Sequence, residues 1–116
     1  MNWNITAGRP VYVQLVEQLE LALVAGEFPP GSRIPPVREL AADAGVNPNT
    51  MQRAMTELER DGLVYSQRTT GRFVTEDQAM IASAKRSLAE RHIQAFLEAM
   101  THLGYGREEI LTLLRQ

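Results

Sequence analysis

The sequence predicts a mainly α-helical fold with one small β-hairpin, and three observations support this fold class. Apolar residues recur every three or four positions along most of the chain, as they do on one face of a helix. Proline and glycine divide this pattern into segments of helical length. Between residues 63 and 74 the pattern gives way to two short runs of β-branched and aromatic residues around a polar tip, which indicates a hairpin.

The composition narrows the possible function classes. The chain has 116 residues, no cysteine and a net charge of −2, which suits one domain, or a small domain with an appendage, in a reducing compartment. The lack of cysteine excludes disulfides, thiolate zinc sites and thiol nucleophiles. No apolar run approaches the roughly 20 residues of a membrane helix, and the first residues do not have the form of a signal peptide. We therefore expect a cytoplasmic protein with no membrane partner.

The first predicted helix covers residues 10–25. Pro10 suits its first turn and Gly26 its C-terminal cap. Residues 28–32 then form a turn, and residues 33–34 are long enough only for a very short strand. The apolar stripe of this helix consists of Tyr12, Leu15, Val16, Leu19, Ala22 and Leu23.

Two more helices are predicted, from Pro36 to Gly45 and from Pro48 to Gly62. The second of them has the clearest start signal, because Asn47 is a good N-cap and proline suits the first helical position. Its apolar residues fall on one face at 100° per residue and its polar residues fall opposite. The apolar face consists of Met51, Ala54, Met55 and Leu58, and the polar face includes Asn49, Arg53, Thr56 and Arg60.

The two helices and the hairpin that follows them form a winged helix-turn-helix pattern, with predicted strands at 63–65 and 72–74. The second helix of such a pair needs a buried face that anchors it and a polar face that is free to enter a major groove. The hairpin tip, residues 66–71, is polar and carries Arg68, as a wing that lies along DNA requires. We therefore expect residues 1–75 to form a winged helix-turn-helix DNA-binding domain.

Residues 76–116 return to a helical pattern that breaks at residues 104–106. A helix of about 25 residues is roughly 38 Å long, and a chain of this size offers too little surface to cover its stripe. Dimerisation explains the stripe economically and supplies two recognition helices for a two-fold operator, whereas packing onto its own domain is the alternative. The prediction is a short C-terminal α-helical dimerisation tail, with interface residues Ile81, Leu88, Ile93, Phe96, Met100, Leu103, Ile110 and Leu114.

The distribution of charge separates the middle of the chain from its two ends. Residues 1–30 have a net charge of −2, residues 31–75 of +1 and residues 76–116 of −1. All basic residues of the middle segment are arginines, which suit bidentate contacts with phosphate or guanine. The overall acidity is therefore compatible with DNA binding and is expected to suppress non-specific binding.

Three stretches resemble the signature of the GntR-type bacterial transcription regulators. They are PPGSRIPPVRELA at 29–41, GVNPNTMQRA at 45–54 and ELERDGLV at 57–64, and the resemblance covers about residues 9–75. The Asn-Pro-Asn-Thr start of the recognition helix, with about 40 residues after the wing, resembles the YtrA subfamily. The larger subfamilies have effector-binding domains of well over a hundred residues, for which we expect no room here.

The resemblance implies a set of DNA contacts. By this resemblance, one contact lies in the second helix, several lie in the first turns of the recognition helix, and others lie around the glycine of the wing tip. Pro36 stands where many relatives have serine, so a hydroxyl cap is lost, and Pro48 and Gln52 stand where relatives outside the subfamily often have arginine. With the arginine of the hairpin tip included, the predicted contacts are Arg38, Asn47, Asn49, Thr50, Gln52, Arg53, Arg68, Thr70, Gly71 and Arg72.

Structural interpretations compete with several of these assignments. Arg53 and Arg60 are candidates for pairing with Glu57 and nearby acids, and for Arg60 pairing is the preferred interpretation. The alternative to a DNA contact for Arg68 is a side chain that is only solvated. His92 and His102 are ten residues apart, which is not a metal-ligand spacing, and no acid–base pair or phosphate-binding loop is present. We expect no metal, no cofactor and no enzymatic activity.

The predicted function is that of a sequence-specific DNA-binding transcription regulator, and of a repressor in particular. It is expected to bind a palindromic operator in double-stranded DNA as a homodimer, and the subfamily resemblance suggests control of a transporter operon. Whether a small-molecule effector binds is left open, and the candidate binding site is the cleft between the DNA-binding part and the helical tail. The alternative is a winged-helix module that binds protein instead of DNA, which the acidic composition favours.

Overall fold

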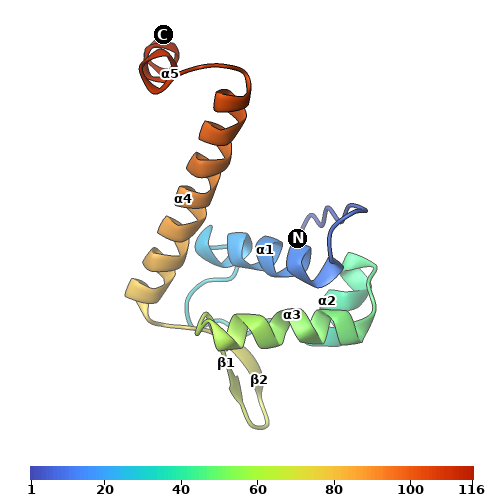
Figure 1. Cartoon of the computed structure of the whole chain (residues 1–116). Helices are drawn as coiled ribbons and strands as arrows, with labels where there is room; N and C mark the ends of the chain where they lie inside the picture. The colour runs from blue at the N-terminus through green and yellow to red at the C-terminus, as the bar shows by residue number, and fades with distance from the viewer. The chain divides into compact units, whose positions relative to one another are not determined.

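The computed structural model describes residues 1–116 and contains five helices and one two-stranded sheet (Figure 1). The predicted fold class, mainly α-helical with a small β-wing, is confirmed. Contacts divide the chain into two compact units, Met1–Lys85 and Arg86–Gln116, so the boundary falls inside the fourth helix. The elements are α1 (Val11–Val24), α2 (Val37–Ala44), α3 (Pro48–Arg60), β1 (Val64–Gln67), β2 (Gly71–Val74), α4 (Gln78–His102) and α5 (Arg107–Leu114).

Helix α3 is the centre of the N-terminal unit. It packs against α1, α2 and β1 (Figure 1). Its predicted apolar face is fully buried, at 0% exposure for all four residues. The remaining core residues come from the other elements of this unit and from the segments that connect them, and are Leu15, Leu19, Leu23, Ile34, Leu40, Ala41, Leu63, Val64 and Val74.

The turn between α2 and α3 is only three residues long. Gly45 ends α2 in the left-handed region with φ 71°, where a side chain would add strain. The side chain of Asn47 then caps α3 by accepting a hydrogen bond of 2.7 Å from the Asn49 N–H, and Pro48 is the first helical residue, as predicted. At the other end of α2, Pro36 provides no side-chain cap, also as predicted. These local signals fix where α3 begins.

The wing is an antiparallel hairpin in which Val64 pairs with Val74 and Gln67 pairs with Gly71. The first strand therefore begins one residue later and ends two residues later than predicted, because backbone pairing in an exposed hairpin does not require apolar side chains. A bridge between Arg33 and Phe73 adds the very short strand predicted at 33–34. The hairpin extends away from the three helices of the N-terminal unit (Figure 1).

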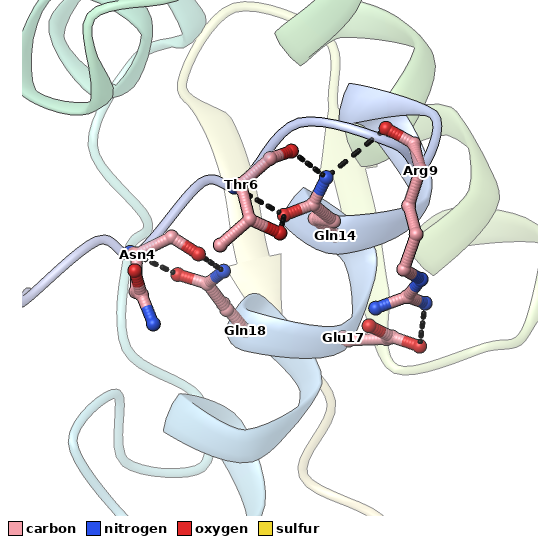
Figure 2. Close-up of polar contacts among 6 residues, drawn as sticks. All are labelled: Asn4, Thr6, Arg9, Gln14, Glu17 and Gln18. Atoms are coloured by element: carbon pink, nitrogen blue, oxygen red, sulfur yellow. Dashed lines mark hydrogen bonds and ion pairs between the residues drawn. The ribbon is translucent and has the colours of Figure 1, made fainter.

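Residues 1–9, for which no element was predicted, are held against α1 by two glutamine side chains (Figure 2). The Gln14 amide accepts from Thr6 N and donates to Thr6 O, both at 2.8 Å. The Gln18 amide makes the same pair of bonds with Asn4, at 2.9 and 2.8 Å. One helical turn of four residues rises about 6 Å and two extended residues span about 6.6 Å, so the two spacings match.

The opposite side of this N-terminal segment faces the core. Met1, Trp3 and Ile5 alternate with the residues that the glutamines bind, and all three pack against the buried cluster. Trp3 Nε1 also donates a hydrogen bond of 2.7 Å to Asp43 of α2. The segment therefore links α1 to α2.

Helix α4 contains no buried residue. Its first turns belong to the N-terminal unit, where Ile81 and Ala84 pack against the core. In the C-terminal unit, Ile93 and Leu103 are 57% and 72% exposed, and only Ile110 of α5 is buried. No helix of the chain is both long and apolar enough to cross a membrane.

Candidate nucleic-acid interface

The exposed face of α3 presents two amide side chains with no partner inside the chain. Asn49 and Gln52 are exposed, and neither side chain donates or accepts a hydrogen bond. Thr50 is half-buried beside them. Asn47 is also exposed, although its side-chain oxygen is occupied by the cap of α3. The first turns of α3 therefore combine fixed backbone geometry with free donors and acceptors.

The six arginines of residues 31–75 fall into two groups that the sequence does not separate. One group has partners: Arg53 stacks on the Tyr12 ring, Arg60 pairs with Glu57 at 3.1 Å, and Arg72 pairs with Glu59. The pairing expected for Arg60 is confirmed. The other group is exposed and has neither an ion pair nor a ring contact, and it consists of Arg33, Arg38 and Arg68.

Arg33 was not among the predicted site residues, and the structure places it beside the wing. Gly71 begins β2 with φ 110°, and a Cβ there would lie 3.1 Å from Arg33 Nε. The guanidinium therefore lies close to the Gly71 backbone, where any larger residue would displace it. The available signals were its place in the basic middle segment and the short strand predicted at 33–34.

The wing is tied to the C-terminal end of α3 by one carboxylate. Glu59 accepts hydrogen bonds from Arg72 Nε and, at 2.7 Å, from Ser66 Oγ, one from each strand. The hydrogen bond from Arg72 lowers the pKa of Glu59 below its ordinary value, while burial opposes this shift. Arg72, predicted as a DNA contact, is 20% exposed, and its Nε–H donates to Glu59 within the chain.

The tip of the wing is exposed and polar. Arg68 has no ion pair, and Thr70 Oγ1 donates to Gln67 Oε1 at 3.0 Å across the turn. This hydrogen bond orders the turn and leaves the arginine pointing into solvent. At the base of the tip, Tyr65 and Phe73 stack across the two strands with ring centroids 5.8 Å apart.

The predicted dimer residues differ in exposure. Ile81 packs against the core of the N-terminal unit, and Ile110 is buried within its own chain. Leu88 and Met100 are half-buried. Four positions remain exposed, namely Ile93, Phe96, Leu103 and Leu114.

The fold and this surface define a winged-helix transcription regulator. The chain belongs to the gntR family of bacterial regulatory proteins, whose model matches residues 11–74. The matched segment begins with α1 and ends with β2, so it contains α3, the elements that pack against it and the whole hairpin.

Two curated relatives extend the similarity beyond the matched domain. The HTH-type transcriptional regulator YhcF of Bacillus subtilis, described as uncharacterized, is 36% identical over 96% of this chain and 92% of its own length. The HTH-type transcriptional repressor YtrA of the same organism is 34% identical over 81% of this chain and 68% of its own length. Both are transcription regulators, which is the class predicted from the sequence.

Solved structures agree in fold. A GntR family transcriptional regulator from Listeria monocytogenes has a TM-score of 0.88 and 33% identity, and the match covers 96% of this chain and 97% of that chain. The DNA-binding domain of AraR, solved in complex with operator ORE1, has a TM-score of 0.56 and 28% identity over 65% of this chain and 94% of its own.

Proposed function

We propose that this chain is a repressor that binds an inverted-repeat operator as a homodimer. One observation carries the proposal: α3 buries its whole apolar face and leaves the Asn49 and Gln52 amides unpartnered. Such a helix is anchored by one face and has free hydrogen-bonding groups on the other, as a recognition helix requires. The operator complex of the related AraR domain supports the same use of this fold.

The first turns of α3 supply the proposed base contacts. Asn and Gln amides pair bidentately with the adenine edge, so Asn49 and Gln52 are suited to direct readout, with Thr50 beside them. Asn47 contributes by fixing the first turn, since its side chain accepts a hydrogen bond from the Asn49 N–H. These residues are the proposed source of sequence preference.

Phosphate contacts are the proposed role of the three arginines that have neither an ion pair nor a ring contact. Arg38 of α2, Arg33 at the base of the wing and Arg68 at its tip each have a guanidinium that no acid neutralises. Thr70 and Gly71 place the wing against the neighbouring groove, and Arg72 acts indirectly through its pair with Glu59. Phosphate contacts of this kind set affinity and register rather than sequence preference.

Dimerisation is the proposed role of residues 76–116, while residues 1–75 bind DNA. Ile93, Phe96, Met100 and Leu103 follow one another at spacings of three, four and three. This is the a/d spacing of a helix that packs against another helix, and none of these four side chains, at the end of α4 and directly after it, is buried within the chain. Two chains joined in this way bring two copies of α3 to a two-fold operator.

Repression, rather than activation, is supported by the similarity to YtrA, which is named a repressor. The subfamily resemblance also supports a transporter operon as the target. Because a bacterial operator lies on the chromosome, the proposed protein acts in the cytoplasm. Neither a small-molecule effector nor its binding site is part of this proposal.

Selection from a random-sequence duplex library, followed by sequencing, tests the proposal. Wild-type protein is expected to enrich an inverted repeat with half-sites about one helical turn apart or a multiple of it. Arg38→Ala is expected to weaken binding to that duplex by about 1–3 kcal/mol. Arg60→Ala is the matched control, since Arg60 already pairs with Glu57, and it should bind almost as wild type does. Enrichment of no shared sequence by wild-type protein would overturn the proposal and favour a protein-binding module.

A further inference from the structure

We infer that Tyr12 of α1 is a positioning residue for DNA binding, because its ring holds Arg53 of α3 in place for a phosphate contact. This inference rests on the proposed DNA-binding function. It assigns a role to a residue outside the helix-turn-helix and the wing.

The two residues meet where α1 and α3 pack against each other. Tyr12 is the second residue of α1 and is half-buried. Arg53 lies in the second turn of α3, on the face opposite the buried residues, and is exposed. The central guanidinium carbon of Arg53 lies 3.6 Å from the centroid of the Tyr12 ring, so the charged group sits directly over the aromatic face.

This stack occupies the face of the guanidinium and leaves its edge available. A guanidinium presents its N–H donors in its own plane, so stacking on a ring does not consume them. Arg53 makes no salt bridge, so no carboxylate neutralises its guanidinium. The ring therefore fixes the position of a cation without neutralising it.

The stack also keeps Arg53 away from the nearest acid on its own helix. Glu57 is four residues further along α3, at the spacing where an ion pair ordinarily forms. It pairs instead with Arg60 at 3.1 Å. If the ring were lost, Arg53 would gain rotamers and would compete for Glu57, and both changes lower its availability for a phosphate.

A double-mutant cycle on the full chain tests this inference. The probe is a 30-base-pair duplex that carries the sequence most enriched by wild-type protein. Arg53→Ala should weaken binding and reduce the slope of log affinity against log salt by about one. Tyr12→Leu, which keeps apolar bulk without the aromatic face, should weaken binding about two- to fivefold and lower the same slope. Tyr12→Phe keeps the ring and should bind as wild type does.

The cycle separates positioning from a general structural role. In the Arg53→Ala background, Tyr12→Leu should have no further effect on affinity, because the residue it positions is gone. Equal losses from Tyr12→Leu in both backgrounds would overturn the inference, as would a loss for Tyr12→Phe as large as that for Tyr12→Leu. The salt slope adds a readout that a loss of folded protein does not move. Failure of wild-type protein to enrich any sequence is a separate result, because it contradicts the proposed function itself.

Discussion

Helices α3 and α4 differ in how their apolar side chains are covered. Helix α3 has 13 residues and four of its apolar side chains are fully buried by its own chain. Helix α4 has 25 residues, buries none, and leaves Ile93 57% exposed and Phe96 40% exposed. The comparison teaches that the recognition helix is anchored within one chain, whereas much of the apolar surface of α4 is still available to a partner.

The largest difference is expected when one apolar side chain of each helix is truncated to alanine. Met55→Ala should lower the free energy of unfolding by about 2–5 kcal/mol, because it leaves a cavity in the core under α3. Ile93→Ala removes an exposed side chain of similar size from α4 and should change the stability of the N-terminal unit by no more than about 0.5 kcal/mol. Urea unfolding followed by circular dichroism measures both. Equal losses would break the distinction between the two helices.

The next effect concerns self-association. Phe96→Glu combined with Leu103→Glu places two carboxylates in the proposed interface and should weaken dimerisation at least about tenfold. Sedimentation velocity over a range of protein concentrations measures the change. Ser87→Glu, at an exposed position of the same helix, is a charge control on the face opposite the apolar stripe. An unchanged association constant for the double variant would place the dimer contact elsewhere or exclude it.

A smaller effect is expected from the cap of α3. Asn47→Ala removes the side-chain acceptor of the Asn49 N–H and should lower the free energy of unfolding by about 1 kcal/mol. Asn47→Asp keeps an acceptor at the helix N-terminus and should restore most of this stability. The test is again urea unfolding, and a stability equal to wild type for Asn47→Ala would contradict the capping role.

The smallest effect depends on pH. The pKa of Glu59 lies below its ordinary value of 4.5, so its pair with Arg72 stabilises the folded state above the unfolded pKa. This contribution is lost as the pH falls through the folded pKa. Glu59→Gln should therefore be less stable than wild type by no more than about 1 kcal/mol at pH 7, since the pair is partly exposed.

The difference between Glu59→Gln and wild type should shrink as the pH falls below about 4.5 and the carboxylate of the wild-type protein is protonated. Unfolding at a series of pH values measures this convergence. A constant difference across the acidic range would show that the pair does not set the pH dependence.

The start and buried face of α3 were predictable because their signals are local. The cap at Asn47, the proline after it and the spacing of four apolar residues all lie within the helix itself. The covering of Ile81 by the N-terminal core was not predictable from the apolar stripe of α4, because the stripe does not distinguish one covering surface from another. The functional division between residues 75 and 76 stays a prediction.

The partners of the polar residues were the least predictable part of the site. Gln14 interrupts the apolar pattern of α1, and the four hydrogen bonds of its side chain to residues 6 and 9 form only after the N-terminal segment folds back. Arg53 was expected either on DNA or beside Glu57, and it stacks on Tyr12 of another helix. Charge counts identify the basic segment, but tertiary contacts decide which of its arginines are free.

The stoichiometry of the protein on DNA tests most directly the claim that the N-terminal unit binds DNA while the C-terminal helices join two chains. The measurement is the molar mass of the wild-type complex with the enriched duplex, by analytical ultracentrifugation. Our account predicts two chains on each duplex, one at each half of the inverted repeat. A saturated complex with one chain on each duplex would contradict it.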